Sequence, residues 1–141
     1  MKATMQDYSK LLKNLSGLEL KTDTDISSLS TMRLKSIGNV VIVENDAALA
    51  PLIKILNQEN CDYRLIGWGA NQILPEDARQ RLYVKLRPPT DPQQYFNKLQ
   101  DVYLLPASQP LNSLISHALK HGLVGWEVLT GIPATVGGAA F

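Results

Sequence analysis

Residues 65–74, Leu-Ile-Gly-Trp-Gly-Ala-Asn-Gln-Ile-Leu, lead from an apolar run into a glycine-rich loop. The apolar run at 63–66 predicts a buried strand. Two glycines flanking one residue permit positive φ angles and remove two Cβ atoms, so successive N–H groups at 67–71 can turn toward one anion such as a phosphate. A tight turn without a ligand explains the same pattern equally well. The loop is not a dinucleotide-binding fingerprint, because residues 72–75 open no helix.

The composition is that of an ordinary globular protein. The chain has 141 residues, of which 45% are apolar and 19% charged, enough for one well-buried domain or two small lobes. A formal net charge of +1 argues against nucleic acid or an anionic membrane as the main partner. The single cysteine, Cys61, excludes an internal disulfide framework and fits a reducing compartment. With no apolar run of roughly 18 residues and no signal-peptide core, a cytoplasmic location is predicted.

The first half of the chain predicts alternating helices and strands. We expect a short amphipathic helix at 6–16, a polar connector at 21–30 and a buried, β-branched strand at 39–44. Further strands are expected at 63–66 and 82–86. A crossover helix between the strands at 39–44 and 63–66 would make them parallel neighbours. The glycine loop would then lie at the carboxyl end of a strand, where α/β sheets place ligands.

The crossover helix is expected to be capped by Asn45 and Asp46. Pro51 lacks an N–H donor and clashes with the preceding turn, so the regular helix is expected to begin near Ala50. Its apolar face is formed by Leu49, Leu52, Ile53, Ile55 and Leu56.

The second half opens at the proline-rich stretch 87–92, the best internal boundary. A strand is predicted at 101–105, followed by a clear amphipathic helix that stops at Gly122. Five glycines and a proline then interrupt the apolar stretch 122–138. Regular packing does not need so many glycines, whereas close approach to a flat ligand does. The helix has its apolar residues at Leu111, Leu114, Ile115, Ala118 and Leu119.

No side chains suggest a catalytic or metal site. His117 and His121 are four apart on a helix and could clasp a metal, but no third ligand is placed to complete a site, so a solvated helix face is preferred. Cys61 lacks a partnering histidine and is not expected to be a nucleophile. We expect Glu127 to form a cap or a salt bridge, and Arg33 and Lys35 to lie on a solvated surface. Trp68 and Trp126 are expected to have a core or lid role. The sequence alone therefore describes a cofactor-binding module on an α/β frame.

Four motifs in order resemble the UDP-N-acetylenolpyruvoylglucosamine reductases. They are Ser-Thr-Met at 30–32, Gly-Trp-Gly-Ala-Asn at 67–71, Gly-Leu-Val-Gly-Trp-Glu at 122–127 and Gly-Ile-Pro-Ala-Thr-Val-Gly-Gly at 131–138. The last motif is specific, whereas the glycine loop alone is weak. The resemblance implies an α+β fold with an α/β-like first lobe: an FAD-binding domain of the p-cresol methylhydroxylase type, in which the flavin lies between two small lobes.

The same resemblance divides the chain into an N-terminal helix and linker at 1–29, a first FAD-binding lobe at 30–87 and an incomplete second lobe at 88–141. The backbone N–H groups of the first glycine loop would hold the pyrophosphate. The second glycine segment would lie along the ribityl chain and isoalloxazine. The cofactor-binding residues implied are Gly67, Trp68, Gly69, Ala70, Asn71, Gln72, Gly131, Ile132, Thr135, Val136, Gly137 and Gly138.

In this family NADPH reduces the flavin, which passes a hydride to the enolpyruvyl double bond to form UDP-N-acetylmuramate for peptidoglycan and cell-wall synthesis. The catalytic residues of the family lie beyond the position that matches Phe141, so the resemblance implies no catalytic residue here. Together with the apolar, uncapped run 137–141, this predicts a part of a longer protein, inactive alone and able to self-associate through its apolar end.

Two alternatives remain open from the sequence. One is a cofactor-free structural or interaction module derived from the same fold, favoured by Ala70 and Ala134, which stand where the family usually has Ser and Gly. The other is a different oxidase or dehydrogenase of the same flavoprotein fold, which would need a different C-terminal domain.

Overall fold

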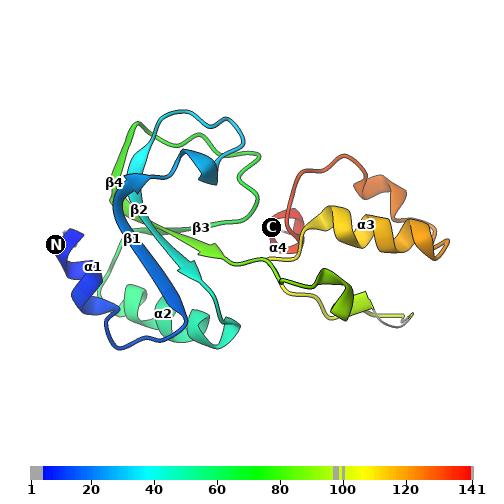
Figure 1. Ribbon diagram of the computed structural model, residues 1–141, viewed down its shortest axis with the longest axis horizontal. Coiled ribbons are helices and arrows are strands. Elements are labelled where there is room, and N and C mark those ends of the chain that lie inside the picture. Colours follow the sequence, from blue (N-terminus) through cyan, green and yellow to red (C-terminus); the bar gives the residue numbers. More distant parts are fainter. Residues whose placement is uncertain (1–4, 97–98, 100, 141) are drawn as a thin grey trace. The chain divides into compact units, whose positions relative to one another are not determined.

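The computed structural model describes residues 5–96, 99 and 101–140. The chain forms two compact units, which divide between Arg87 and Pro88. The first unit is a sheet with helices, and the second is a set of short helices and loops (Figure 1). Each unit has its own core of buried apolar side chains.

The first unit is built on a four-stranded sheet in the order β1-β2-β4-β3. Strand β1 (Leu18–Asp25) pairs antiparallel with β2 (Ile37–Val43). Strand β4 (Asp77–Leu86) lies between β2 and β3 (Tyr63–Ile66) and runs parallel to both. Each parallel strand therefore ends at the same edge of the sheet.

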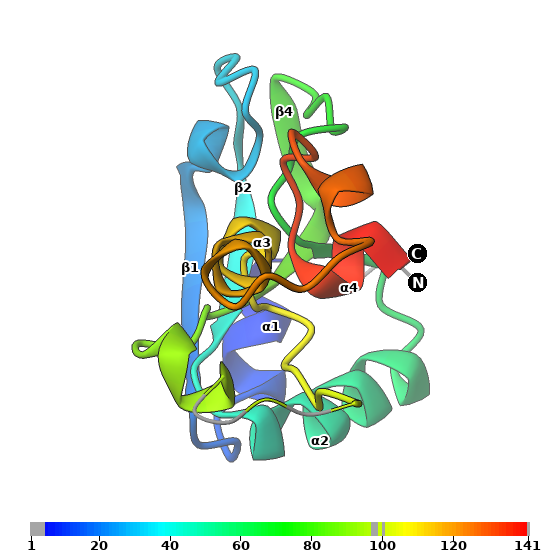
Figure 2. The same cartoon turned by 90° about the vertical axis from the view of Figure 1, so that its right-hand side faces the viewer.

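Helices α1 (Met5–Leu11) and α2 (Asp46–Gln58) cover one face of this sheet (Figures 1 and 2). Successive strand residues alternate between the two faces. On the helix-covered face the core holds Tyr8, Leu12, Ala48, Leu52 and Leu56 with Val41, Val43, Leu82 and Val84. On the other face a smaller cluster holds Ile26, Leu29, Val40, Ile66, Leu74, Ala78 and Tyr83.

Helix α2 begins earlier than its proline suggested. Asn45 caps it, because its side-chain oxygen accepts a hydrogen bond from the N–H of Ala47 at 2.9 Å. Pro51 lies inside the helix on its exposed side. The carbonyl group of Ala47, which loses the N–H of Pro51 as partner, belongs to an exposed residue that water can reach.

The strands predicted at 39–44, 63–66 and 82–86 are confirmed, but their arrangement was partly wrong. The stretch 21–30 is not a connector: its first residues belong to β1, an edge strand whose polar side chains face solvent. Strands β2 and β3 are parallel but not neighbours, because the longer and more buried β4 separates them. Strand β3 is consequently an edge strand with two exposed residues rather than a buried one.

The N-terminal helix, predicted at 6–16, ends at Leu11. The chain then turns toward Gly17, whose φ angle is +75°. Glycine adopts this left-handed conformation without strain, so the helix gives way to β1.

The second unit contains η2 (Pro92–Phe96), α3 (Leu111–Lys120), η3 (Glu127–Leu129) and α4 (Val136–Ala140). The predicted amphipathic helix is confirmed as α3, and Gly122 follows it with a φ angle of +64°. The strand predicted at 101–105 is wrong. Within the described residues of this unit the β-type pairing is the isolated bridge between Pro110 and Thr135, so the segment has no strand to pair with.

His117 corrects a second expectation, because it lies in the core of this unit rather than on a solvated face. Its ring stacks on Phe96 with centroids 4.6 Å apart, and its Nε2 lies 3.1 Å from the hydroxyl of Tyr103. Burial lowers the pKa of His117, and the nearby positive groups of His121 and Lys120 lower that pKa further. The folded unit therefore favours the neutral imidazole.

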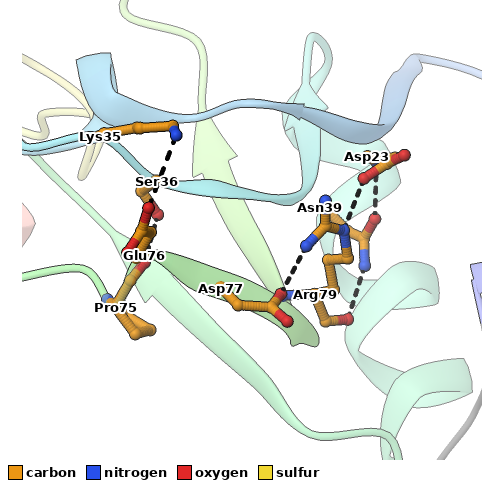
Figure 3. A network of polar contacts seen from close by, with 8 residues as sticks. All are labelled: Asp23, Lys35, Ser36, Asn39, Pro75, Glu76, Asp77 and Arg79. Carbon is orange, nitrogen blue, oxygen red and sulfur yellow. Dashed lines mark hydrogen bonds and ion pairs between the residues drawn. The ribbon is translucent and has the colours of Figure 1, made fainter.

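Two irregularities of the sheet meet at one buried side chain. The β1–β2 pairing shifts register between Lys21 and Thr24, and the β2–β4 pairing shifts just before Asn39. The Asn39 side chain accepts a hydrogen bond from the N–H of Asp23 at 3.1 Å and donates one to the carbonyl of Arg79 at 2.8 Å (Figure 3). Asn39 thus satisfies backbone groups that both bulges leave unpaired.

We predict that Asn39→Ala destabilises the first unit by about 2–3 kcal/mol, because it leaves a donor and an acceptor unpaired in the interior. Urea unfolding followed by far-UV circular dichroism measures this change. The exposed Asn57, which accepts one hydrogen bond from the hydroxyl of Tyr63, is the control. Asn57→Ala should change the free energy of unfolding by no more than about 0.5 kcal/mol. Equal effects of the two substitutions would contradict the role assigned to Asn39.

We also predict that the second unit loses stability as the pH falls below 6.5, the ordinary pKa of histidine. The unfolded chain binds the proton of His117 more tightly than the folded chain, so stability is fully present above that pH and declines below it. Fluorescence of Trp126 in a Trp68→Phe background reports unfolding of this unit. His117→Phe should remove most of the pH dependence, whereas the exposed His121, changed to Gln, should retain it. A His117→Phe profile with an unchanged slope would refute this assignment.

Candidate functional site

The glycine loop 67–76 connects the carboxyl end of β3 to the start of β4. Its predicted site residues differ in exposure: Gly67, Trp68 and Asn71 are exposed, Ala70 and Gln72 are half-buried, and Gly69 is buried. The loop therefore presents part of its backbone to solvent while one glycine is enclosed.

Gly69 is enclosed by the backbone of a distant segment. Its φ angle is +78°, and a Cβ atom built on it would lie 1.9 Å from the carbonyl oxygen of Leu29. The carbonyl oxygen of Gly69 accepts a hydrogen bond from the N–H of Thr31 at 3.1 Å. Close approach of two backbones thus requires glycine at this position, independently of any ligand.

Two buried serines hold the rest of the loop from the same side. The hydroxyl of Ser30 donates to the carbonyl of Gln72 and accepts a hydrogen bond from the N–H of Met32 at 3.2 Å. The hydroxyl of Ser36 donates to the carbonyl of Pro75 at 2.7 Å (Figure 3). The segment 29–36 is therefore a continuous support for the loop.

The loop keeps backbone donors available. Among the hydrogen bonds within residues 5–96, none uses the N–H group of Trp68, Gly69, Ala70 or Asn71 as donor. Donors fixed on a supported loop can bind an anion without first being released from other partners. The arrangement is thus chemically suited to a phosphate.

Lys85 adds a positive charge that sequence reasoning missed. It pairs in register with Ile66, the last residue before the loop, and lies on the same face of the sheet as Tyr83. Lys85 is half-buried, and the ion pairs of the described part of the chain do not include it. Burial lowers the pKa of its ammonium group. A lysine near the end of the strand after a glycine loop is the signal that could have identified it.

The second glycine segment lies in the second unit, and the N–H groups of its residues 136–138 are bonded within that unit. The N–H groups of Val136 and Gly137 donate to the carbonyls of Gln109 and Ala107 at 2.8 and 2.9 Å. The N–H of Gly138 donates to the side-chain oxygen of Thr135 at 3.2 Å. The last part of this segment therefore offers a closely packed backbone surface rather than a set of free donors. Of its predicted site residues, Gly131, Ile132 and Gly138 are exposed, Val136 and Gly137 are half-buried, and Thr135 is buried.

The predicted site residues therefore form two groups, residues 67–72 in the first unit and residues 131–138 in the second. Other candidates have structural roles. Cys61 lies in the core of the first unit, and Trp126 packs in that of the second. The exposed Glu127 accepts a hydrogen bond from the N–H of Gly125 at 2.7 Å, which is a local capping contact.

Within the described ranges, no group of three or more His, Cys, Asp or Glu side chains could hold a metal ion. No helix in the same ranges is long and apolar enough to cross a membrane.

We predict that Gly69→Ala destabilises the first unit by at least ~3 kcal/mol, because it adds a collision with backbone to the strain of a positive φ angle. Gly17→Ala is the matched control, since Gly17 has nearly the same φ angle but its nearest neighbour is the Asn45 Cβ at 3.0 Å. That control should cost only ~1–2 kcal/mol. Thermal unfolding of both variants measures these losses. Similar losses of stability in the two variants would show that the close approach to Leu29 does not constrain residue 69.

Comparison with known proteins gives consistent matches. The chain is 31% identical over 140 residues to UDP-N-acetylenolpyruvoylglucosamine reductase of Streptococcus pneumoniae strain JJA, covering 97% of this chain and 44% of that protein. It is 29% identical over 135 residues to the reductase of the same name from Myxococcus xanthus strain DK1622, covering 91% of this chain and 42% of that protein. No protein-family model matches the chain.

The fold also has a counterpart among solved structures. The crystal structure of UDP-N-acetylenolpyruvylglucosamine reductase from Thermus caldophilus superimposes with a TM-score of 0.61 and 24% sequence identity, over 86% of this chain and 40% of that chain. The mixed α/β architecture is therefore shared, and the sequence matches confirm the resemblance that the four motifs carry. The chain is therefore similar to UDP-N-acetylenolpyruvoylglucosamine reductases over nearly all of its own length, and it spans less than half the length of the relatives that it matches.

Proposed function

We propose that the chain is the FAD-binding part of such a reductase. The first unit is the first lobe of a p-cresol methylhydroxylase-type domain, and the second unit is the start of the second lobe. The observation that carries the proposal is the supported loop whose N–H groups, from Trp68 to Asn71, have no hydrogen-bond partner within residues 5–96. A pyrophosphate is the part of FAD that such a loop binds.

Lys85 supports this assignment electrostatically. A half-buried ammonium group without a carboxylate partner in the described residues is relieved of its desolvation cost when an anion binds nearby. The loop and Lys85 would hold the pyrophosphate, while residues 131–138 would lie along the ribityl chain and isoalloxazine. When bound, the flavin supplies hydride transfer, which no side chain of the protein can supply.

In the whole protein we propose NADPH as reductant and UDP-N-acetylenolpyruvoylglucosamine as the substrate, reduced for peptidoglycan synthesis. The 141-residue chain alone is expected not to reduce the substrate, because it spans less than half the length of the reductases that it matches. Steady-state assays with NADPH, FAD and the enolpyruvyl substrate test this, and measurable substrate reduction by the purified chain would overturn it.

A cofactor-free structural module is the second candidate. It is favoured by the engaged N–H groups of residues 136–138, which leave the second segment with fewer donors for a ligand. Titration of the desalted protein with FAD, followed by flavin fluorescence and visible absorbance, separates the two candidates. FAD binding supports the flavoprotein, and absence of binding at any accessible FAD concentration supports the module.

We predict that Lys85→Met weakens FAD binding about tenfold or more and reduces its dependence on salt, because a charged partner of the pyrophosphate is lost. Lys54→Met is the control, since Lys54 is exposed on helix α2, which packs against the other face of the sheet. That variant should bind FAD like the unmodified chain. Riboflavin, which has no phosphate, should bind the Lys85 variant and the unmodified chain equally. A uniform loss for both ligands would contradict a phosphate-directed role.

A further inference from the structure

Ser30 makes contacts that reach beyond its own segment. It is 4% exposed, and its hydroxyl donates to the carbonyl oxygen of Gln72, 42 residues further along the chain. The same oxygen accepts a hydrogen bond from the N–H of Met32. A buried hydroxyl with both roles occupied fixes the position of the groups that it joins.

The geometry of the peptide bond determines where the N–H groups next to these bonded carbonyls point. A trans peptide is planar, and its C=O and N–H groups point to opposite sides; the described chain contains no cis peptide. The carbonyl of Gly69 is held by Thr31, so the N–H of Ala70 points away from that segment. The carbonyl of Gln72 is held by Ser30, so the N–H of Ile73 also points away from it.

Both N–H groups are available. Within residues 5–96 neither Ala70 nor Ile73 uses its N–H in a hydrogen bond. The two carbonyls that anchor their peptides are three residues apart and bind adjacent residues of one segment. The loop therefore cannot rotate either peptide without breaking a bond to Ser30 or Thr31.

We propose that Ser30 is a positioning residue for the anion loop. By fixing the Gln72–Ile73 peptide, it presents the N–H of Ile73 beside that of Ala70 as a pair of donors for the pyrophosphate. This inference rests on the proposed function of the loop, and it assigns a donor, Ile73, outside the residues 67–72 that the sequence indicated.

Ser36 supplies a matched control. It is also fully buried, and its hydroxyl donates to the carbonyl of Pro75 on the same stretch of chain, beyond the loop donors (Figure 3). Ser30→Ala and Ser36→Ala remove the same group from similar surroundings. Both should lower the melting temperature to a similar extent, so stability alone does not separate them.

The ligand series separates them. Ser30→Ala should weaken FAD and ADP about fivefold, the worth of one net hydrogen bond, while Ser36→Ala stays within about twofold. Riboflavin affinity should be unchanged in both variants, because only phosphate-bearing ligands use the loop. If the unmodified chain binds FAD and the two serine variants bind it equally, the positioning role of Ser30 is wrong and the proposed function stands.

Failure of FAD to bind would overturn the proposed function, but the donor pair can then still be tested with inorganic pyrophosphate. In a titration of the full chain with inorganic pyrophosphate, amide NMR should show shifts at Ala70 and Ile73, reduced in Ser30→Ala and retained in Ser36→Ala. Absence of shifts at both amides in the unmodified chain would overturn the assignment of this donor pair.

Discussion

The backbone around Leu29 lies so close to the backbone of Gly69 that no side-chain carbon fits between them. From this contact the segment 29–39 runs beside the segment 69–79, joined in turn by Thr31, Ser30, Ser36 and Asn39. The first contacts support the glycine loop, and the last contacts hold the sheet where its register shifts. One backbone approach therefore links the position of the candidate site to the geometry of the sheet beneath it.

The two glycine segments use their glycines for different purposes. In the first unit one glycine admits a neighbouring backbone, and the peptides around it keep their N–H groups available. In the second unit Gly137 packs against Ala107, with a built Cβ only 2.9 Å from the Cβ of that residue, and its N–H is bonded to the same residue. A glycine-rich sequence thus marks close approach in both cases, but the first segment keeps a run of unbonded N–H groups, whereas residues 136–138 of the second use theirs internally.

Sequence patterns predicted the elements whose residues show their environment directly. The β-branched run at 39–44 and the apolar stripe of α3 were recognised because burial selects such residues. Strand β1 was missed because an edge strand can be polar, and the strand order was missed because β4 inserts from further along the chain. Ser30 was missed as a site residue because its hydrogen bond to the loop joins residues 42 positions apart, which no local pattern reveals. Lys85 was missed because its place beside Ile66 depends on the pairing of β3 with β4.

Because β3 lies at the edge of the sheet, the stability of β3 and of the loop that follows it can differ from that of the rest of the sheet. This strand has four residues and one neighbour, β4, so it can separate from the sheet at a lower free energy than the central strands require. Whatever the loop binds would oppose that local opening, in proportion to its affinity for the closed form. The affinity of the ligand and the free energy of opening the β3–β4 pairing would then be linked through the same equilibrium.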